Sequence, residues 1–94
     1  EVDKPVPATA QFTELTRKND NRRTVNLSWS KVNDATGYNI RFGTQKNKLY
    51  HNYLVYEDNK VSINILNADQ TYYFAIDSFN EAGVTIGKEI KTIQ

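Results

Sequence analysis

The clearest indication of the fold lies in residues 25–30, VNLSWS, where Val25, Leu27 and Trp29 alternate with small polar residues. An alternation with a period of two is typical of a β-strand that buries one face and exposes the other. The apolar face of this strand carries Trp29, the one tryptophan in the chain. Because tryptophan brings the largest apolar surface of any side chain, we expect Trp29 to form the centre of a core between two layers.

The same alternation recurs along the chain and is interrupted by clusters of turn-forming residues. We predict seven strands, around residues 10–16, 25–30, 38–42, 49–56, 61–65, 72–77 and 84–93. The connections between them are short, which favours antiparallel pairing because a parallel crossover needs a dozen or more residues. No segment carries a convincing run of apolar residues at helical spacing. The pattern therefore predicts an all-β protein, an antiparallel sandwich of two sheets.

The length of the chain limits it to one domain, since 94 residues leave no room for a second core. Residues 1–7 contain both prolines, Pro5 and Pro7, and are predicted to be an extended linker from a preceding domain. The folded domain is predicted to cover residues 8–94. Because the chain begins without methionine, we interpret it as a piece of a larger protein.

The charge and cysteine content exclude several classes of function. Twelve basic and eleven acidic residues give a net charge of +1, so no long-range field favours nucleic acid or a membrane surface. No segment is apolar enough for membrane insertion. A basic cluster at Arg17, Lys18, Arg22 and Arg23 is interpreted as a solvated loop. With no cysteine, the chain has neither a disulfide nor a thiolate for catalysis or metal binding.

Four features together resemble a fibronectin type III domain over about residues 7–92. They are Trp29 in the second strand, the stretch GYNI at 37–40, Leu66 six residues before Tyr72, and the Asn80-x-x-Gly83 turn. The resemblance implies a seven-stranded, immunoglobulin-like sandwich with the strand of Tyr38 between the strands of Tyr53 and Tyr72. It also implies that the Tyr72 hydroxyl bonds to the backbone near residues 66–69. Residues assigned to structure on this basis are Trp29, Tyr38, Leu66 and Tyr72.

Three longer runs are similar to the modules appended to bacterial glycoside hydrolases. They are ATGYNIRFGT at 35–44, KLYHNY at 48–53 and TYYFAIDSFNE at 71–81. Such modules are common in secreted enzymes of xylan and arabinan breakdown, especially in Bacteroidetes. The resemblance implies an extracellular, periplasmic or cell-surface parent and a non-catalytic accessory module that spaces or orients the catalytic domain. A protein-interaction module of a surface adhesin is an alternative.

No catalytic, cofactor or metal site is predicted. A glycosidase needs two carboxylates flanking a sugar in a cleft. Asp77 and Glu81 are the nearest such pair, but a small convex sandwich gives them no cleft, so we interpret them as surface charges. His51, the single histidine, cannot form a zinc site or a triad unaided and is expected at the surface.

The chain carries more aromatic residues than a small core requires. In residues 49–56, each of the two alternating faces carries at least one tyrosine and one aliphatic residue. Whichever face is buried, a tyrosine and an aliphatic residue therefore remain outside. The candidate contact residues on this sheet are Asn39, Arg41, Tyr50, Tyr53, Tyr73, Asp77 and Phe79.

Three interpretations of this surface remain open. The aromatics can be scattered and bind nothing, or they can dock against a neighbouring domain of the same polypeptide. Alternatively, they bind polysaccharide, with Tyr50, Tyr53, Tyr73 and Phe79 stacking on sugar rings and Asn39, Arg41 and Asp77 bonding the hydroxyls. In each case the isolated domain is expected to be monomeric.

Overall fold

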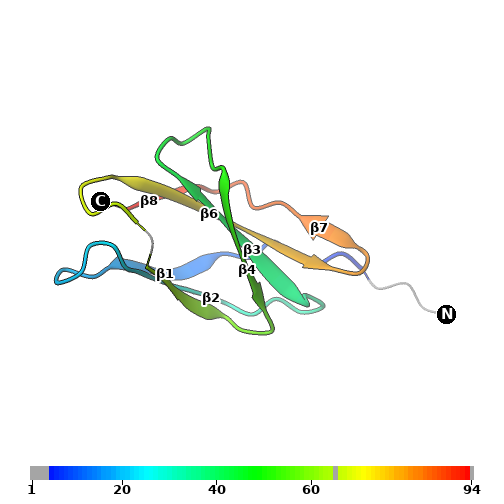
Figure 1. Ribbon diagram of the computed structural model, residues 1–94. Helices are drawn as coiled ribbons and strands as arrows, with labels where there is room; N and C mark the ends of the chain where they lie inside the picture. Colours follow the sequence, from blue (N-terminus) through cyan, green and yellow to red (C-terminus); the bar gives the residue numbers. More distant parts are fainter. Residues whose placement is uncertain (1–4, 65, 94) are drawn as a thin grey trace.

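The computed structural model describes residues 5–64 and 66–93, and these form a two-layer β-sandwich (Figure 1). The described residues contain the strands β1 (Phe12–Arg17), β2 (Val25–Trp29), β3 (Gly37–Gly43), β4 (His51–Tyr56), β5 (Lys60–Ile63), β6 (Tyr72–Asn80), β7 (Gly83–Thr85) and β8 (Lys91–Ile93). The smaller sheet has the order β1-β2-β5. The larger sheet has the order β4-β3-β6-β7, and β8 also pairs with β6.

Every strand pair is antiparallel, which confirms the predicted all-β sandwich. The position of β3 between β4 and β6 also agrees with the topology that the resemblance implied. In the register of these strands, Ile40 lies opposite Tyr53 on one side and Ile76 on the other.

The last predicted strand, at 84–93, is interrupted in the structure, so the described residues contain eight strands. β7 pairs with the end of β6 and β8 with its beginning, and the chain leaves the ladder near Gly87. The Gly87 N–H donates to Asp77 Oδ1 at 2.9 Å, and its carbonyl accepts from Arg41 Nη2 at 2.8 Å. A Cβ at position 87 would lie 1.9 Å from the Ile76 carbonyl oxygen. The backbone at this point therefore approaches β6 too closely for any other residue.

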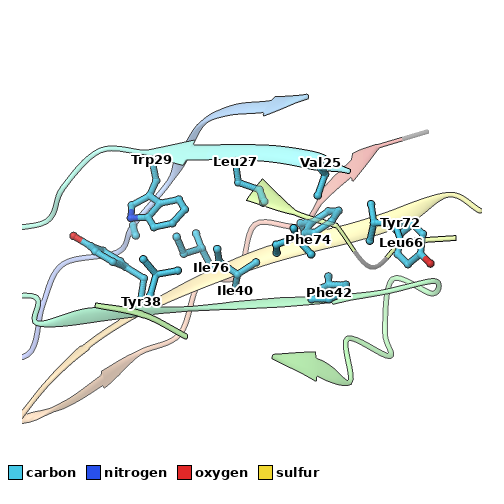
Figure 2. Packing of buried hydrophobic residues seen from close by; sticks show 13 residues of the cluster. Val25, Leu27, Trp29, Tyr38, Ile40, Phe42, Leu66, Tyr72, Phe74 and Ile76 are labelled. Atoms are coloured by element: carbon cyan, nitrogen blue, oxygen red, sulfur yellow. The ribbon is translucent and has the colours of Figure 1, made fainter. Parts of the chain in front are cut away.

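The core lies between the two sheets, where the apolar faces of β2, β3 and β6 meet (Figure 2). Trp29 is 1% exposed, with its ring centroid 5.4 Å from that of Tyr38 and 6.5 Å from that of Phe12. The four residues assigned to structure are all buried. The members of the core are Ala10, Val25, Leu27, Trp29, Tyr38, Ile40, Phe42, Val55, Ile63, Leu66, Tyr72, Phe74 and Ile76.

The Tyr72 hydroxyl joins β6 to the preceding connection. Its oxygen accepts a hydrogen bond from the Asn67 N–H at 2.7 Å, within the segment that the resemblance indicated. The phenol ring packs against Phe42 and Phe74, so the side chain has a buried apolar body and a bonded polar end.

Part of the segment predicted as a linker lies against β6 and β7. The Asn80 amide donates to the Pro5 carbonyl at 2.7 Å, the Thr85 hydroxyl donates to the Pro7 carbonyl, and Pro7 is buried. The Ser78 hydroxyl donates to the Ala8 carbonyl at 2.6 Å. All three contacts use backbone carbonyls, which proline retains, so the two prolines do not prevent this docking.

Candidate interaction surface

The outer face of the larger sheet carries the residues that alternate with the core residues of β3, β4 and β6. On β3, Tyr38, Ile40 and Phe42 are buried in the core, so Asn39 and Arg41 belong to the opposite face. The register extends this face across the neighbouring strands. Its members are Gly37, Asn39, Arg41, Asn52, Leu54, Tyr56, Tyr73, Ala75, Asp77, Phe79 and Val84.

The candidate residues predicted from the sequence do not all share this face. Asn39, Arg41, Tyr73, Asp77 and Phe79 lie on it. Tyr53 pairs with the core residue Ile40, so it belongs to the inner side of the β4 edge, where it is 39% exposed. Tyr50 precedes β4 and is 76% exposed. Tyr53 therefore does not share the outer face with the other candidate residues on β3 and β6.

Asp77 is enclosed and occupied by the protein's own groups. Its side chain is 3% exposed, and Oδ2 accepts from Arg41 Nε at 3.0 Å. Its other oxygen, Oδ1, accepts the Gly87 N–H, and the Arg41 guanidinium donates in addition to the Gly87 carbonyl. Asp77 was interpreted from the sequence as an exposed charge, either solvated or bonding to a sugar, and the structure corrects the exposure. The Asp77 carboxylate on β6 thus links Arg41 of β3 to Gly87, which lies in the segment between β7 and β8.

Asn39 is also engaged within the sheet. Its amide group donates to Asn52 Oδ1 at 3.0 Å. Its own Oδ1 is buried and has no hydrogen-bond partner among the described residues. Asp77 therefore directs its carboxylate into the protein. Asn39 and Arg41 each bond to neighbouring groups of the protein but stay partly exposed, with 26% of the Arg41 side chain exposed.

An apolar patch occupies one end of the outer face. It consists of Leu54, Tyr56, Phe79 and Val84, on β4, β6 and β7. The Tyr56 and Phe79 rings meet edge to face at 5.7 Å over Gly37, where a Cβ would lie 2.5 Å from Phe79 Cζ. Leu54, Tyr56 and Val84 are 53%, 61% and 57% exposed. Leu54, Tyr56 and Val84 were not among the sequence-predicted contacts, and only the register of β4 and β7 identifies them.

The family model for the Fibronectin type III domain matches residues 10–93. The chain belongs to the fibronectin type III family. An Fn3-like protein from Clostridium thermocellum is similar in structure, with a TM-score of 0.80 and 17% sequence identity, covering 94% of this chain and 92% of that one. At this identity, the similarity supports the fold alone.

Two vertebrate proteins contain similar fibronectin type III domains. The fn3 domain of human contactin 1 has a TM-score of 0.72 and 19% identity, covering 96% of this chain and 79% of that one. The chicken CNTN1 FN1-FN3 domains have a TM-score of 0.73 and 21% identity, covering 93% of this chain and 32% of that one. No curated protein matches the chain.

Arg17 of this fibronectin type III domain is a structural residue, which corrects its interpretation as part of a solvated loop. It is 6% exposed and its guanidinium donates to the carbonyls of Arg22, Asn67 and Gln70. The guanidinium carbon lies 5.5 Å from the centroid of the Tyr72 ring. Burial lowers the pKa of Arg17 from its usual value, and the nearby charge of Arg22 lowers this pKa further. Arginine nevertheless stays charged, so the side chain ties two connections together by charge-assisted hydrogen bonds.

The remaining features of the fibronectin type III domain concern metal-binding clusters, apolar helices and the single histidine. Among residues 5–64 and 66–93, no group of three or more histidine, cysteine or acidic side chains could hold a metal ion. The same residues include no helix long and apolar enough to cross a bilayer. His51 is exposed and stacks on Phe42, with the ring centroids 5.1 Å apart.

Proposed function

We propose that this fibronectin type III domain is a non-catalytic module that docks against a neighbouring domain of its own polypeptide and orients it. The observation that supports docking is the apolar patch of Leu54, Tyr56, Phe79 and Val84 at one end of the outer face. Three of its four side chains expose more than half of their surface. Contiguous exposed apolar residues of this kind are typical of protein interfaces.

The arrangement favours a protein partner over a sugar. Recognition of a sugar needs polar groups that are free to bond its hydroxyls beside an exposed aromatic ring. Here Asp77 and Asn39 already bond to Arg41, Gly87 and Asn52. The Tyr56 and Phe79 rings stand at 80° to one another and do not form a continuous flat surface. A protein surface can cover such an uneven apolar patch without needing those polar groups.

We further propose that the parent polypeptide is a bacterial glycoside hydrolase acting on xylan or arabinan, outside the cytoplasm. Support comes from the runs at 35–44, 48–53 and 71–81, which are similar to modules appended to such enzymes. In this setting the module braces the catalytic domain and leaves the chemistry to it. A surface adhesin that uses the same patch to bind a protein is the alternative parent.

The test uses a polypeptide that contains this domain and the domain beside it. Tyr56→Ser removes the most exposed ring of the patch. Tyr50→Ser is the control, because it removes a similarly exposed tyrosine that lies just before the start of β4. We expect Tyr56→Ser to lower the unfolding temperature of the neighbouring domain by a few degrees, since about 1–2 kcal/mol of apolar contact is lost. Tyr50→Ser should leave it unchanged. Equal effects of the two substitutions would contradict docking through the patch.

A further inference from the structure

The edges of the two sheets differ in how they are protected against pairing with another strand. Sheet edges in soluble proteins are commonly short, charged or irregular, because a long neutral edge invites a further strand. The edge strand β5 has four residues and begins with Lys60, while β7 and β8 have three each. The edge strand β1 carries Glu14 and a break in its register between Phe12 and Glu14.

β4 has none of these protections. It is six residues long, contains no lysine, arginine, acidic residue or proline, and pairs without a break in register with β3. Among the described residues no strand lies on its other side. Apart from Asn52, its side chains are apolar or aromatic on both faces, with Leu54 and Tyr56 on the outer face and Tyr53 on the inner side. β4 is therefore the edge that is best suited to accept another strand.

The charges that flank β4 indicate which strand it accepts. Lys48 lies before the strand, and Glu57 and Asp58 follow it directly. When two copies of such a strand run antiparallel, the basic end of each lies beside the acidic end of the other. A parallel arrangement would place like charges together at both ends. The sequence is thus electrostatically complementary to itself in the antiparallel direction.

We propose that β4 pairs antiparallel with β4 of a second copy of this chain, so that the two larger sheets become one continuous sheet. A two-fold axis perpendicular to the sheet keeps outer residues opposite outer residues. A register centred on Tyr53 places Asp58 opposite Lys48 of the second copy and Tyr56 opposite its Tyr50. Because each copy has one β4 edge, the assembly closes at the dimer.

The interface is small, since it consists of one short strand from each copy. We expect a dissociation constant on the order of 100 µM, as for weak interfaces that bury less than about 1,200 Å². At low micromolar concentration the chain is then monomeric, and dimers form where many copies are held close together, as at a cell surface. This inference concerns the isolated chain and does not depend on the proposed docking partner.

Sedimentation velocity of this chain from about 10 µM to about 1 mM tests the pairing. We expect the sedimentation coefficient to rise to the value of a dimer and no further. Leu54→Lys places a charge in the middle of the edge and should weaken association at least about tenfold. The matched control is Val84→Lys, at a similarly exposed apolar residue on β7, and it should leave association unchanged.

A charge exchange tests the direction of pairing. Lys48→Glu and Asp58→Lys should each weaken the dimer, and the double variant should restore it, because the opposite charges again face each other. A chain that stays monomeric over the whole concentration range overturns the proposal. Growth beyond a dimer, equal effects of Leu54→Lys and Val84→Lys, or a double variant weaker than both single variants would overturn it as well.

Discussion

Asp77 Oδ1 accepts a hydrogen bond from the Gly87 N–H at 2.9 Å, at the point where the last strand leaves the ladder. The side chain thus takes the place of a backbone partner that β6 would otherwise supply. Because Arg41 bonds both Asp77 and the Gly87 carbonyl, both polar groups of the Gly87 backbone have side-chain partners. This arrangement allows the strand to be interrupted without leaving buried backbone groups unpaired.

Replacing Asp77 by alanine should therefore destabilise the domain. The variant leaves the buried Gly87 N–H without a partner and Arg41 without its carboxylate. We expect a loss of about 2–3 kcal/mol in the free energy of unfolding, measured by urea denaturation, given that Arg41 is partly exposed. Asp77→Asn, which keeps an acceptor oxygen, should lose less than Asp77→Ala. Equal stability of Asp77→Ala and the wild type would show that the interruption does not depend on this residue.

The Tyr72 hydroxyl gives a second prediction. Tyr72→Phe removes the acceptor of the Asn67 N–H and keeps the buried ring. The expected loss is about 1–1.5 kcal/mol, the net contribution of one buried hydrogen bond. Tyr73→Phe is the matched control, because Tyr73 is only half-buried on the outer face, and it should change stability by less than about 0.5 kcal/mol. A Tyr73→Phe effect as large as that of Tyr72→Phe would rule out a special role for this hydrogen bond.

Arg17 provides a test of the buried guanidinium. Arg17→Lys keeps the positive charge but cannot donate to three carbonyls in three directions. We expect a loss of about 2–3 kcal/mol in thermal or urea unfolding, together with faster amide exchange around Asn67 and Gln70, whose carbonyls lose their donor. Lys18→Met, at the adjacent exposed residue, should leave both unchanged. Arg17→Lys with wild-type stability would mean that charge alone suffices.

Trp29 tests the dependence of the fold on its largest core residue. Trp29→Ala should cost about 3–5 kcal/mol, because the cavity cannot close between two sheets. The free energy of unfolding of a domain of this size is about 5–14 kcal/mol in total. If the wild-type value lies near about 5 kcal/mol, the variant should be close to unfolded. Near-ultraviolet circular dichroism and urea denaturation report the loss. A variant that keeps a cooperative transition at the wild-type midpoint would contradict the central role of Trp29.

The sequence was sufficient to predict the first six strands and the burial of Trp29, because alternation is a local property of each segment, but not the interruption of the last strand. It could not place Asp77, because neither of its partners is a neighbour in the sequence. Arg41 lies on β3, and Gly87 lies in the interruption between β7 and β8, which no motif marks. Arg17 was misread for the same reason, since two of its carbonyl partners lie 50 and 53 residues away.

The choice of exposed aromatics depended on the register of β4 against β3. Alternation puts Tyr53 and Tyr56 on opposite faces of the strand, but only the pairing of Tyr53 with Ile40 and of Tyr56 with Gly37 shows which face is the outer one. The apolar patch emerged from that pairing. A prediction of the site from the sequence alone therefore needed the relative position of two strands, which the alternation of each strand does not contain.

Asn39, Arg41 and Asp77 bond to neighbouring groups of the protein, and from this we expect that the outer face does not bind sugar. The most direct measurement is a titration of the ¹⁵N-labelled chain with xylan or arabinan fragments, followed by amide shifts, since the buried Trp29 would not report on this face. We expect no saturable shift at Asn39, Arg41, Tyr73 or Asp77 at millimolar sugar. Saturable shifts confined to these residues would show that the face binds carbohydrate and would contradict this expectation.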